Sequence, residues 1–557
     1  MSQHPHEKKW QAHWDTTDLY AWKGSVSREN IFAIDTPPPT VSGSLHIGHV
    51  FSYTQTDILA RYQRMKGKDV FYPMGWDDNG LPTERRVQAV FGITCQPDMP
   101  YDPQWVPQKK TGSHPPEPVS RRNFVEACLL LTQEDEKMFE NTWKQLGLSV
   151  DWKQTYSTMN PHCTVVSQRS FLDLVAKNNI YQAQAPTMWD VDFQTAVAQA
   201  EIEDRTLPGA YHRIAFKTEA GDSFVIATTR PELLPACIAI VAHPDDARYS
   251  HLFGQQAITP LFGAHVPIMP STHANPSKGT GILMVCTFGD QADVDFWKQS
   301  SLPVKQILGK DGRFIPLSFT QAPFLSDDPQ KAQDMYKHWE SLRPHHVRKH
   351  IEGVLGDDLV APIEPIEHPV KFYEKGDSPI EFITTRQWFV HILEHKDALL
   401  NRGKDIQWHP AYMQTRYLNW VEGINQDWCI SRQRFFGVPF PVWYPLDAHQ
   451  NPQYDTPIFA TLDQLPVDPQ SHTPAGFEAC QRGCPNGFIG DPDVMDTWAT
   501  SSLTPQLMSH WGKDDDRHHR LFPMDIRPNL MKSFAHGPFI PLPKHGCIIK
   551  QCLGDMC

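Results

Sequence analysis

Apolar runs alternate with amphipathic stretches along the first part of the chain. Residues 31–34 (IFAI) form a short apolar run, as expected of a buried parallel strand. Three prolines at 37–39 end it, because proline can neither continue a strand ladder nor enter a helix interior. Residues 48–66 then repeat apolar positions at helical spacing, and residues 70–74 (VFYPM) are a second apolar run. The order strand, loop, helix, strand predicts the start of a doubly wound α/β sheet. The apolar positions of the predicted helix are Val50, Ile58, Leu59 and Tyr62.

The periodicity changes twice further along the chain. Residues 124–148 have helical periodicity, and Gly147 is placed to end that helix. From about residue 186 the spacing is that of strands, and alternating runs at 223–228 and 280–285 predict a compact β-rich insert. We therefore expect a Rossmann-type doubly wound parallel sheet interrupted by this insert. The expected boundaries are 1–185 and 376–530 for the two halves of the α/β domain, 186–375 for the insert and 531–557 for a separate tail.

Composition and charge bear on the number of domains, the cellular compartment and the binding partners of the protein, but not on the reaction it carries out. The length of 557 residues predicts several domains. No run of about 18 apolar residues is present, so we expect no membrane span. The first residues lack the apolar region of a signal peptide, and the 11 cysteines follow no secreted-type framework, which together indicate a cytoplasmic protein. The net charge of −13 disfavours general nucleic-acid binding, although a local basic patch could still bind RNA.

Two histidines and one aspartate carry candidate chemistry in the first part of the chain. His46 and His49 stand three apart in the first turn of the predicted helix and therefore share a face. A helix N-terminus suits an anion, and imidazoles there can hydrogen-bond a triphosphate and stabilise charge that develops at its α-phosphorus. Asp77 follows the second apolar run, where open α/β sheets bind ligands, and its carboxylate could hold an ammonium group. Two histidines at this spacing are more often ordinary helix-surface residues, so the spacing alone does not decide.

Residues 37–88 as a whole resemble the first half of a class I aminoacyl-tRNA synthetase. Residues 46–49 (HIGH) match the first ATP signature of that family, and the triple proline is typical of its branched-chain amino acid subgroup. Residues 75–84 (GWDDNGLPTE) are similar to one branch of the valyl enzymes. Isoleucyl enzymes usually have Cys-His, and leucyl enzymes Ala-Phe, where this chain has Asp78 and Asn79. The resemblance therefore implies valine as the amino acid, with isoleucine or leucine as the alternative.

The resemblance also implies where ATP and the amino acid bind. His46 and His49 would be the catalytic residues, and the implied ATP-binding residues are His46, Gly48, His49 and Asp496. Residues 427–434 (DWCISRQR) and 491–498 (DPDVMDTW) resemble two further motifs of the subgroup, whose tryptophans wall the pocket for the amino acid side chain. An apolar slot between two indoles suits a branched aliphatic group, although an isolated tryptophan is better explained by core packing. The implied valine-binding residues are Pro38, Asp77, Trp428 and Trp498, with Asp77 on the ammonium group.

The resemblance further implies the ligands and partners of the protein. ATP would be a substrate accompanied by Mg²⁺, although no residue in the sequence by itself marks a ligand for the ion. The partners would be valine and tRNA(Val). We expect a monomer.

Three stretches of the β-rich insert resemble the editing domain of the same family. They are residues 227–232 (ATTRPE), 278–281 (KGTG) and 286–293 (CTFGDQAD). An editing pocket needs hydroxyls and a carboxylate to hold a mischarged ester and orient a water molecule. The candidate editing residues are Thr228, Thr229, Arg230, Asp290 and Asp293, with Asp293 on the amino group of the substrate. The alternative is that the two threonines reflect edge-strand propensity and the two aspartates are caps.

One departure from the family pattern concerns the details of this pocket. Many valyl enzymes have a Lys-x-Thr-Pro-Ala-His run where this chain has residues 284–289 (MVCTFG). The need for editing follows from magnitudes known for valyl enzymes themselves, whose hydrophobic valine pocket rejects isosteric threonine by only about 10²-fold. Given valine specificity, we expect threonyl-tRNA(Val) to be the substrate of the editing reaction.

Two other features of the sequence concern metal binding and the end of the chain. Cys480, Cys484 and His472 suggest zinc, but no second pair follows at zinc-finger distance, so we expect no metal site. Residues 531–557 match nothing in the family, and their codons read one base out of step permit the helix expected there (HEIIRTWAF). We therefore expect a frame-shifted tail and a valyl-tRNA synthetase truncated before the second ATP signature, KMSKS. The alternative is a fragment that does not activate an amino acid and only hydrolyses mischarged tRNA.

Overall fold

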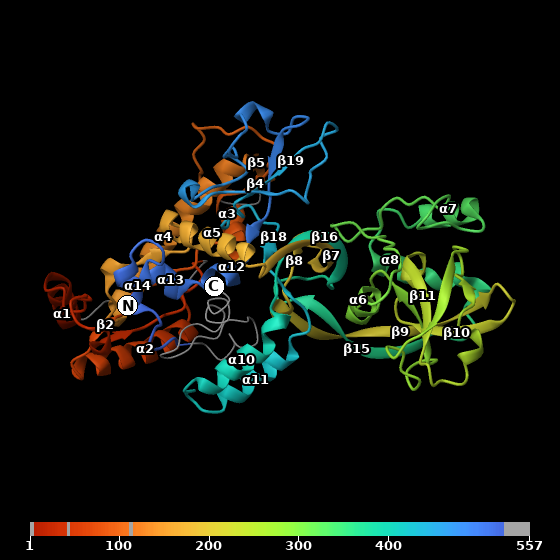
Figure 1. Cartoon of the computed structure of the whole chain (residues 1–557), viewed down its shortest axis with the longest axis horizontal. Coiled ribbons are helices and arrows are strands. Elements are labelled where there is room, and N and C mark those ends of the chain that lie inside the picture. Colours follow the sequence, from red (N-terminus) through yellow and green to blue (C-terminus); the bar gives the residue numbers. More distant parts are fainter. Residues whose placement is uncertain (1–4, 42–44, 111–114, 529–557) are drawn as a thin grey trace. The chain divides into compact units, whose positions relative to one another are not determined.

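The computed structural model describes residues 5–41, 45–110 and 115–528, and the chain divides into two compact units (Figure 1). Unit 1 comprises Met1–Gln182 and Trp388–Cys557, and unit 2 comprises Ala183–Gln387. The chain leaves unit 1 within β7 (Ile180–Asp190) and returns to it within β16 (Glu381–Val390). The predicted frame-shifted tail lies outside the described residues.

Unit 1 is built around short parallel strands. Strand β1 (Ile31–Ala33) pairs in parallel with β2 (Asp69–Phe71), and β3 (Gly75–Trp76) pairs in parallel with β6 (Tyr156–Ser157). A parallel bridge between Ile34 and Ile526 adds the end of the described chain beside β1. Because these strands are joined through helices, unit 1 has the α/β organisation predicted from the apolar runs, and the predicted fold class is confirmed.

The helices of unit 1 lie before, between and after these strands. They are α1 (Pro5–Thr16), α2 (Ile47–Met65), α3 (Leu81–Phe91), α4 (Arg121–Leu146), α5 (Pro161–Ala176), α10 (Lys396–Asp405), α11 (Met413–Gly423), α12 (Thr497–Ser501), α13 (Thr504–Ser509) and α14 (Asp515–Leu521). Helix α4 begins at the N-cap Ser120, whose hydroxyl accepts a hydrogen bond from the Asn123 amide, and Gly147 follows its last residue with a φ of +76°. The predicted helix end at Gly147 is therefore confirmed, since glycine adopts this left-handed conformation without strain.

Helix α2 buries a different face from the predicted one. The apolar side chains of Ile58 and Tyr62 are 61% and 54% exposed, although periodicity placed them on the buried stripe. The structure instead buries Asp57, whose carboxylate accepts hydrogen bonds from the amide and the hydroxyl of Ser149, both at 2.6 Å. Apolar spacing located the helix, but a polar contact to a distant loop decides which face is covered. The buried positions of α2 are Tyr53, Thr56, Asp57 and Ala60.

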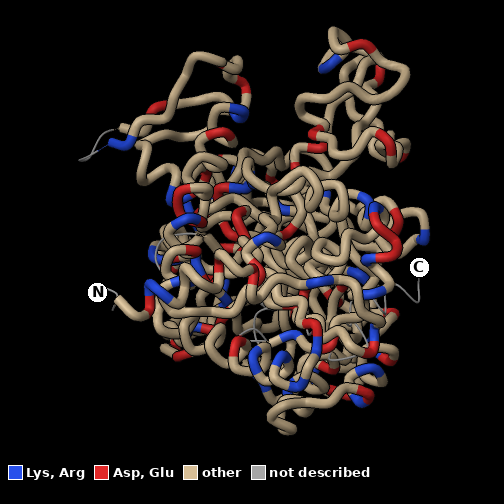
Figure 2. Tube along the Cα trace, turned by 90° about the vertical axis from the view of Figure 1, so that its left-hand side faces the viewer, with Lys and Arg blue, Asp and Glu red and all other residues tan. Residues whose placement is uncertain are grey.

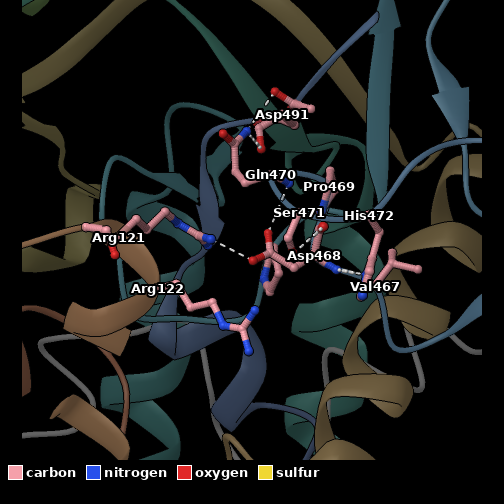
Figure 3. Close-up of polar contacts among 12 residues, drawn as sticks. Arg121, Arg122, Val467, Asp468, Pro469, Gln470, Ser471, His472 and Asp491 are labelled. Carbon is pink, nitrogen blue, oxygen red and sulfur yellow. Dashed lines mark hydrogen bonds and ion pairs between the residues drawn. The ribbon is translucent and has the colours of Figure 1, made fainter. Parts of the chain in front are cut away.

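The remaining strands of unit 1 are short and largely antiparallel. They are β4 (Ile93–Cys95), β5 (Glu117–Val119), β17 (Trp428–Cys429), β18 (Ser431–Arg432), β19 (Val442–Pro445), β20 (Ile458–Phe459), β21 (Phe488–Gly490) and β22 (Val494–Met495). Strands β19, β20 and β21 form a small sheet. The turn at 467–472 beside this sheet is held to the start of α4, because the Arg121 guanidinium donates to the Asp468 carboxylate at 2.6 Å (Figure 3).

Unit 2 is rich in strands. Within the described residues its main sheet has the order β10-β9-β12-β13-β11-β14, and β15 pairs with the first part of β9. Its strands are β8 (Thr195–Ala196), β9 (Ile202–Thr218), β10 (Ser223–Thr228), β11 (Cys237–Ala242), β12 (Gln256–Ile258), β13 (His265–Pro270), β14 (Ile282–Cys286) and β15 (Glu364–Tyr373). Its helices are α6 (Gln291–Lys298), α7 (Pro329–Lys337), α8 (Pro344–Arg348) and α9 (Ile351–Leu355). The predicted β-rich insert is therefore present, whereas its role in editing stays a prediction.

Two properties concern the described residues of both units. None of their helices is long and apolar enough to cross a membrane. Basic and acidic side chains are interspersed along the trace (Figure 2), in keeping with 51 Lys and Arg against 64 Asp and Glu in the whole sequence.

Candidate functional sites

The two histidines of the HIGH stretch cap helix α2 together. His46 is the N-cap residue, just before the first turn in which both rings were expected, and its Nδ1 accepts a hydrogen bond from the Gly48 amide at 3.1 Å. The Nδ1 of His49 accepts one from the His46 amide at 3.3 Å, and the two ring centroids are 3.9 Å apart. Two of the amides that a helix start leaves unpaired are thereby satisfied by imidazoles.

This capping arrangement leaves the outer edge of each ring for a ligand. Because Nδ1 accepts a hydrogen bond in both rings, the proton of each neutral imidazole is on Nε2, which is then a donor. Burial lowers the pKa of His49, and the neighbouring His46 lowers it further, so that His49 is neutral at pH 7. A side chain on Gly48 would collide with the His46 ring, since a Cβ there would stand 2.9 Å from its Cε1. The result is a pair of N–H donors at a helix N-terminus, a combination suited to phosphate oxygens.

Asp77 lies at the carboxyl end of β3 and is fixed through its backbone. Its amide donates to the Pro39 carbonyl at 3.0 Å, and its own carbonyl accepts from the Val41 amide at 2.9 Å. The Pro37 carbonyl accepts a hydrogen bond from the Tyr53 hydroxyl at 2.6 Å, and that tyrosine belongs to α2. The proline segment that contains Pro38 is therefore held between α2 and the strand end that carries Asp77.

The neighbouring carboxyl group of Asp78 is occupied in a different way. Its carboxylate accepts a hydrogen bond from the Ser157 hydroxyl. Burial raises the pKa of Asp78, and burial together with the charge of Asp78 raises the pKa of Glu136 to about 8. Asp78 and Glu136 therefore retain a proton between them at pH 7. Of the two adjacent aspartates, Asp77 is the better candidate for an ammonium group, as the sequence predicted.

The two tryptophan motifs converge on the loop that follows Asp77. Strands β18 and β22 pair directly, and the Asp496 amide donates to the Ile430 carbonyl at 2.7 Å. A Cβ on Gly80 would lie 2.7 Å from the hydroxyl oxygen of Thr497, so the GWDDNG loop is packed against the start of α12. Trp428, in β17, and Trp498, in α12, are thereby placed on segments that meet around this loop.

The Asp496 carboxylate is bonded to other groups of the protein. Its carboxylate accepts from the Trp498 amide at 3.0 Å and forms an ion pair with Arg432 at 2.8 Å, and the side chains of both charged residues are at most 8% exposed. This geometry favours a role in positioning Trp498 over a direct contact with ATP. The ATP contact predicted for Asp496 stays a prediction.

The three editing-like stretches of unit 2 also meet one another. The Arg230 guanidinium donates to the Gly289 carbonyl at 3.1 Å and forms ion pairs with Glu381 at 2.9 Å and Glu232 at 3.2 Å. The hydroxyl of Thr280 accepts from the Ala227 amide at 3.3 Å. The segments 227–232, 278–281 and 286–293 therefore surround one location, as an editing pocket would require.

Asp293 approaches the same glycine from its other side. Its Oδ2 accepts from the Gly289 amide at 2.8 Å, while its own amide donates to the Asp290 carboxylate at 3.0 Å. Burial raises the pKa of Asp293 well above its usual value, and the charge of Asp290 raises it further. Asp290 is the N-cap of α6, so the alternative reading of this residue as a cap describes its contacts correctly. A cation bound beside Asp293 would restore its ionised form.

The two threonines among the candidate editing residues differ in their contacts. The Thr228 hydroxyl accepts from the Arg230 amide at 3.1 Å and is half-buried at the end of β10. Thr229 is half-buried in the turn that follows. Neither contact assigns a reaction, and the editing roles of both residues stay predictions.

The comparisons with known proteins decide the family. The family model for class I tRNA synthetases (I, L, M and V) matches residues 9–529. The chain belongs to this family. Its relatives include the valine–tRNA ligase of Thermobifida fusca (strain YX), 56% identical over 528 residues, and that of Salinispora tropica, 52% identical over 529 residues. Each match covers 94% of this chain but only 59% and 61% of the relatives, so the chain spans about three fifths of the length of the curated relatives it matches.

Solved structures of synthetases are also similar to the chain. The ternary complex of Agrobacterium radiobacter K84 agnB2 LeuRS with tRNA and LeuAMS aligns with a TM-score of 0.43 and 20% identity. The alignment covers 94% of this chain and 62% of that chain.

Several residues of the synthetase chain that organise these sites were not singled out from the sequence. Glu84 is buried, and its carboxylate accepts from the amides of Phe435 and Phe436 at 2.7 and 2.9 Å, which ties the GWDDNGLPTE stretch to the loop after β18. Glu232 is fully buried between Arg230 and Arg348. A glutamate inside an apolar helix start is the available signal for such a role, because buried carboxylates need partners.

The cysteine pair suggested by spacing has ordinary contacts. Cys480 and Cys484 are exposed, and the Cys484 thiol donates to the Cys480 carbonyl at 3.3 Å. His472 accepts a hydrogen bond on Nδ1 from the Asp468 amide at 2.9 Å (Figure 3). Across the described residues, no group of three or more His, Cys, Asp and Glu side chains could hold a metal ion.

Proposed function

We propose that this chain carries the amino acid activation site of a valine–tRNA ligase together with a hydrolytic editing site. The observation that carries the proposal is the identity of 48–56% to curated valine–tRNA ligases over 94% of this chain. The geometry around α2 and Asp77 supports the first site, and the meeting of three stretches around Gly289 supports the second. The relatives favour valine over the isoleucine or leucine that the sequence left open.

In the proposed activation reaction, a valine carboxylate oxygen attacks the α-phosphorus of ATP and pyrophosphate leaves. The Nε2–H groups of His46 and His49 donate to phosphate oxygens and stabilise the charge that grows there in the transition state. Asp77 holds the valine ammonium, while Trp428 and Trp498 enclose the side chain and Pro38 closes the pocket beside Asp77. The terminal ribose of tRNA(Val) then takes the valyl group, and AMP leaves.

Magnesium is proposed to accompany ATP. Because Mg²⁺ usually keeps several waters and binds through substrate phosphates and one or two carboxylates, it needs no protein cage. The proposal therefore assigns the ion to the phosphates of the nucleotide, where it would neutralise part of their charge. A monomer in the cytoplasm is proposed on the sequence features given above.

In the proposed editing reaction, water attacks the ester carbonyl of threonyl-tRNA(Val), and the ribose hydroxyl leaves. Asp293 binds the amino group of the threonyl ester, and that cation lowers the raised pKa of its carboxyl group. Asp290 adds negative charge beside it. Arg230 donates to Glu381, Glu232 and the Gly289 carbonyl, so its proposed role is to hold the Gly289 turn in place. Thr228 and Thr229 contribute hydroxyls at the edge of the pocket.

A pair of variants tests both sites at once. We expect Asp77→Ala to lower valine-dependent ATP–pyrophosphate exchange by about 10²- to 10³-fold, since it removes the partner of a buried charge, and to leave threonyl-tRNA(Val) hydrolysis intact. We expect Asp293→Ala to do the reverse. The exposed carboxylates Asp98 and Asp334 supply matched Asp→Ala controls that should change neither activity.

The outcomes of this test separate the alternatives. Retained hydrolysis in the Asp293 variant would contradict the editing site. Exchange driven by isoleucine or leucine rather than valine would reassign the amino acid. Hydrolysis without any exchange would support the alternative of a fragment that only hydrolyses mischarged tRNA.

A further inference from the structure

A buried threonine at the end of β6 lies beside Asp77. Strand β6 pairs in parallel with β3, where Ser157 is the partner of Trp76, and the Thr158 amide continues the ladder by donating to the Trp76 carbonyl at 2.9 Å. Asp77 and Thr158 therefore follow their strands at the same edge of the sheet, where open α/β sheets bind ligands. Thr158 is only 1% exposed. A buried hydroxyl thus reaches the strand end that is proposed to bind the amino acid.

The hydroxyl of Thr158 contacts three consecutive residues of the GWDDNG loop. Its oxygen accepts a hydrogen bond from the Asp78 amide at 3.1 Å. The same oxygen is 2.9 Å from Oδ1 of Asn79 and 3.5 Å from Oδ1 of Asp77. A threonine hydroxyl has one proton to donate, so only one of these two oxygens receives it at a time.

The side chain of Asn79 bears on where that proton goes. Asn79 is 1% exposed, and its Nδ2 is buried without a hydrogen-bond partner among the described residues. An unpaired buried donor costs stability, and turning the amide group by 180° places Nδ2 where it donates to the Thr158 oxygen. The two lone pairs of that oxygen then accept from Asn79 and from the Asp78 amide, and its proton is left for the Asp77 carboxylate.

Neighbouring hydroxyls of β6 and its end thereby serve the two adjacent aspartates separately. Ser157 donates to Asp78, whose carboxyl group shares a proton with Glu136, whereas Thr158 faces Asp77. A hydrogen bond donated to a carboxylate favours its ionised form and fixes its orientation. An ionised carboxylate in a fixed orientation is what an ammonium group requires for a charge-assisted hydrogen bond.

We propose that Thr158 is a positioning residue for the amino acid, whose hydroxyl donates to Oδ1 of Asp77 and orients that carboxylate toward the ammonium group of valine. This inference rests on the activation site proposed above and adds how its ammonium-binding carboxylate is held. Thr158 acts through Asp77 and touches no substrate, since its own side chain is buried.

The test compares two stable analogues of the valyl adenylate that activation forms. In the first, valine is joined to adenosine through a sulfamate. In the second, 3-methylbutanoate replaces valine, so that the carbon skeleton is kept and the ammonium group is absent. We expect Thr158→Val to weaken binding of the first compound by about 10- to 100-fold, as for loss of one hydrogen bond to a charged group, and to leave binding of the second unchanged. Calorimetric titration of the whole chain measures both affinities.

Three further variants control for packing and folding. Thr158→Ser keeps the hydroxyl and should keep most of the affinity for the valyl compound. Thr158→Ala removes the same hydroxyl without placing a methyl group against the Asp78 amide, so it repeats the test should Thr158→Val fail to fold. Thr155→Val is the matched control, because Thr155 is exposed on the same segment and its hydroxyl donates to the Trp152 carbonyl. It should bind both compounds as the unaltered chain does.

The outcomes separate this inference from the function it rests on. Unchanged binding of the valyl compound by a folded variant without the hydroxyl, or an equal loss for both compounds, would overturn the role of Thr158 and leave the activation site standing. A loss in Thr158→Ser as large as that in Thr158→Val would also overturn it, since packing would then explain the effect. If the unaltered chain bound neither compound, the activation site and the role of Thr158 would both fall.

Discussion

The two candidate sites use polar side chains in opposite ways. In unit 1, the imidazoles of His46 and His49 pair with backbone amides through Nδ1 and keep their Nε2–H groups for a ligand. In unit 2, the Arg230 guanidinium donates to Glu232, Glu381 and the Gly289 carbonyl, and its charge is balanced by the two carboxylates. One site presents donors outward, and the other holds a closed network.

This difference follows from what each site is proposed to bind. ATP arrives with several negative charges, so donors at a helix N-terminus suffice and need no counter-charge from the protein. A threonyl ester differs from its valyl competitor by one hydroxyl. The second site therefore needs a rigid pocket rather than a strong electrostatic field. A closed ion network fixes the Gly289 turn, and Asp293 beside it is proposed to bind the amino group of the ester. The predictions below test each half of this contrast, from the largest expected effect to the smallest.

We expect substitutions in the ion-pair network around Arg230 to lower the stability of the protein more than substitutions of the paired histidines do. We expect Glu232→Gln to lower the free energy of unfolding of unit 2 by about 3–5 kcal/mol, because it removes the fully buried carboxylate that the half-buried cations Arg230 and Arg348 share. Ion pairing lowers the pKa of Glu232 despite its burial, so its contribution is present above the ordinary value of 4.5 and is lost as the pH falls through the lowered value. Urea unfolding at pH 7 and pH 3, followed by hydrogen exchange in unit 2, measures both effects.

A matched surface variant distinguishes the network from ion pairs in general. Arg213 and Glu364 form an exposed pair at 3.0 Å, and Glu364→Gln should change stability by less than about 0.5 kcal/mol. Equal changes in the free energy of unfolding for the two substitutions would show that the buried network stabilises the protein no more than an exposed ion pair does.

We expect the Nε2–H groups of His46 and His49 to contribute to the activation reaction rather than to the stability of the protein. We expect His49→Ala to lower valine-dependent ATP–pyrophosphate exchange by about 10²- to 10³-fold, as for loss of one preorganised donor to a developing charge. The loss of a helix cap should cost only about 1 kcal/mol of stability. Exchange rates and thermal melting of the variant and of the exposed control His449→Ala provide the measurement. A variant that melts early and reacts normally would reverse the assignment.

A buried lysine offers a test of how well unit 2 tolerates unpaired charge. Lys305 is 5% exposed, and burial lowers its pKa. We expect Lys305→Met to raise the free energy of unfolding at pH 7 by about 1–3 kcal/mol, because it removes a poorly compensated polar group. The unfolded chain binds the proton more tightly than the folded chain, so the gain should shrink as the pH rises toward the usual value of 10.5. The exposed Lys298→Met is the control, and a pH-independent gain would point to packing instead.

The smallest effect is expected outside both sites. Cys480→Ser should change the free energy of unfolding by less than about 0.5 kcal/mol, and a chelator should leave the melting temperature unchanged, since the two thiols are exposed. A melting point that falls with chelator in the unaltered chain and not in the variant would establish a metal site there.

Local patterns predicted much of the fold from the sequence. The strand at 31–34, the helix from residue 47 and the helix end at Gly147 depend on short-range rules of periodicity and glycine conformation. The buried face of α2 was predicted wrongly, because the contact between Asp57 and Ser149 joins residues 92 positions apart. Apolar spacing cannot anticipate that a carboxylate is drawn inward by a distant loop.

The residues of the candidate sites also fall into those that a sequence motif indicated and those that it missed. Motif resemblance named His46, Asp77 and Asp293, since these occur in recognisable runs. It missed Glu84 and Glu232, whose partners come from other segments, and it missed Thr158, which contacts the GWDDNG loop from the end of β6. These depend on pairing partners that a single stretch of sequence does not reveal.

The sequence by itself indicated the family, the first strands and helices of unit 1 and the β-rich insert, because each is written in contiguous runs. Only the tertiary structure decided that the Asp78–Glu136 pair retains a proton, that the backbone of Asp77 is fixed between Pro39 and Val41, and that Arg230 forms ion pairs with Glu232 and Glu381. The physical reason is that pKa values, ion pairing and hydrogen-bond satisfaction depend on burial and on neighbours brought together by folding, and these are properties of the packed chain rather than of any segment.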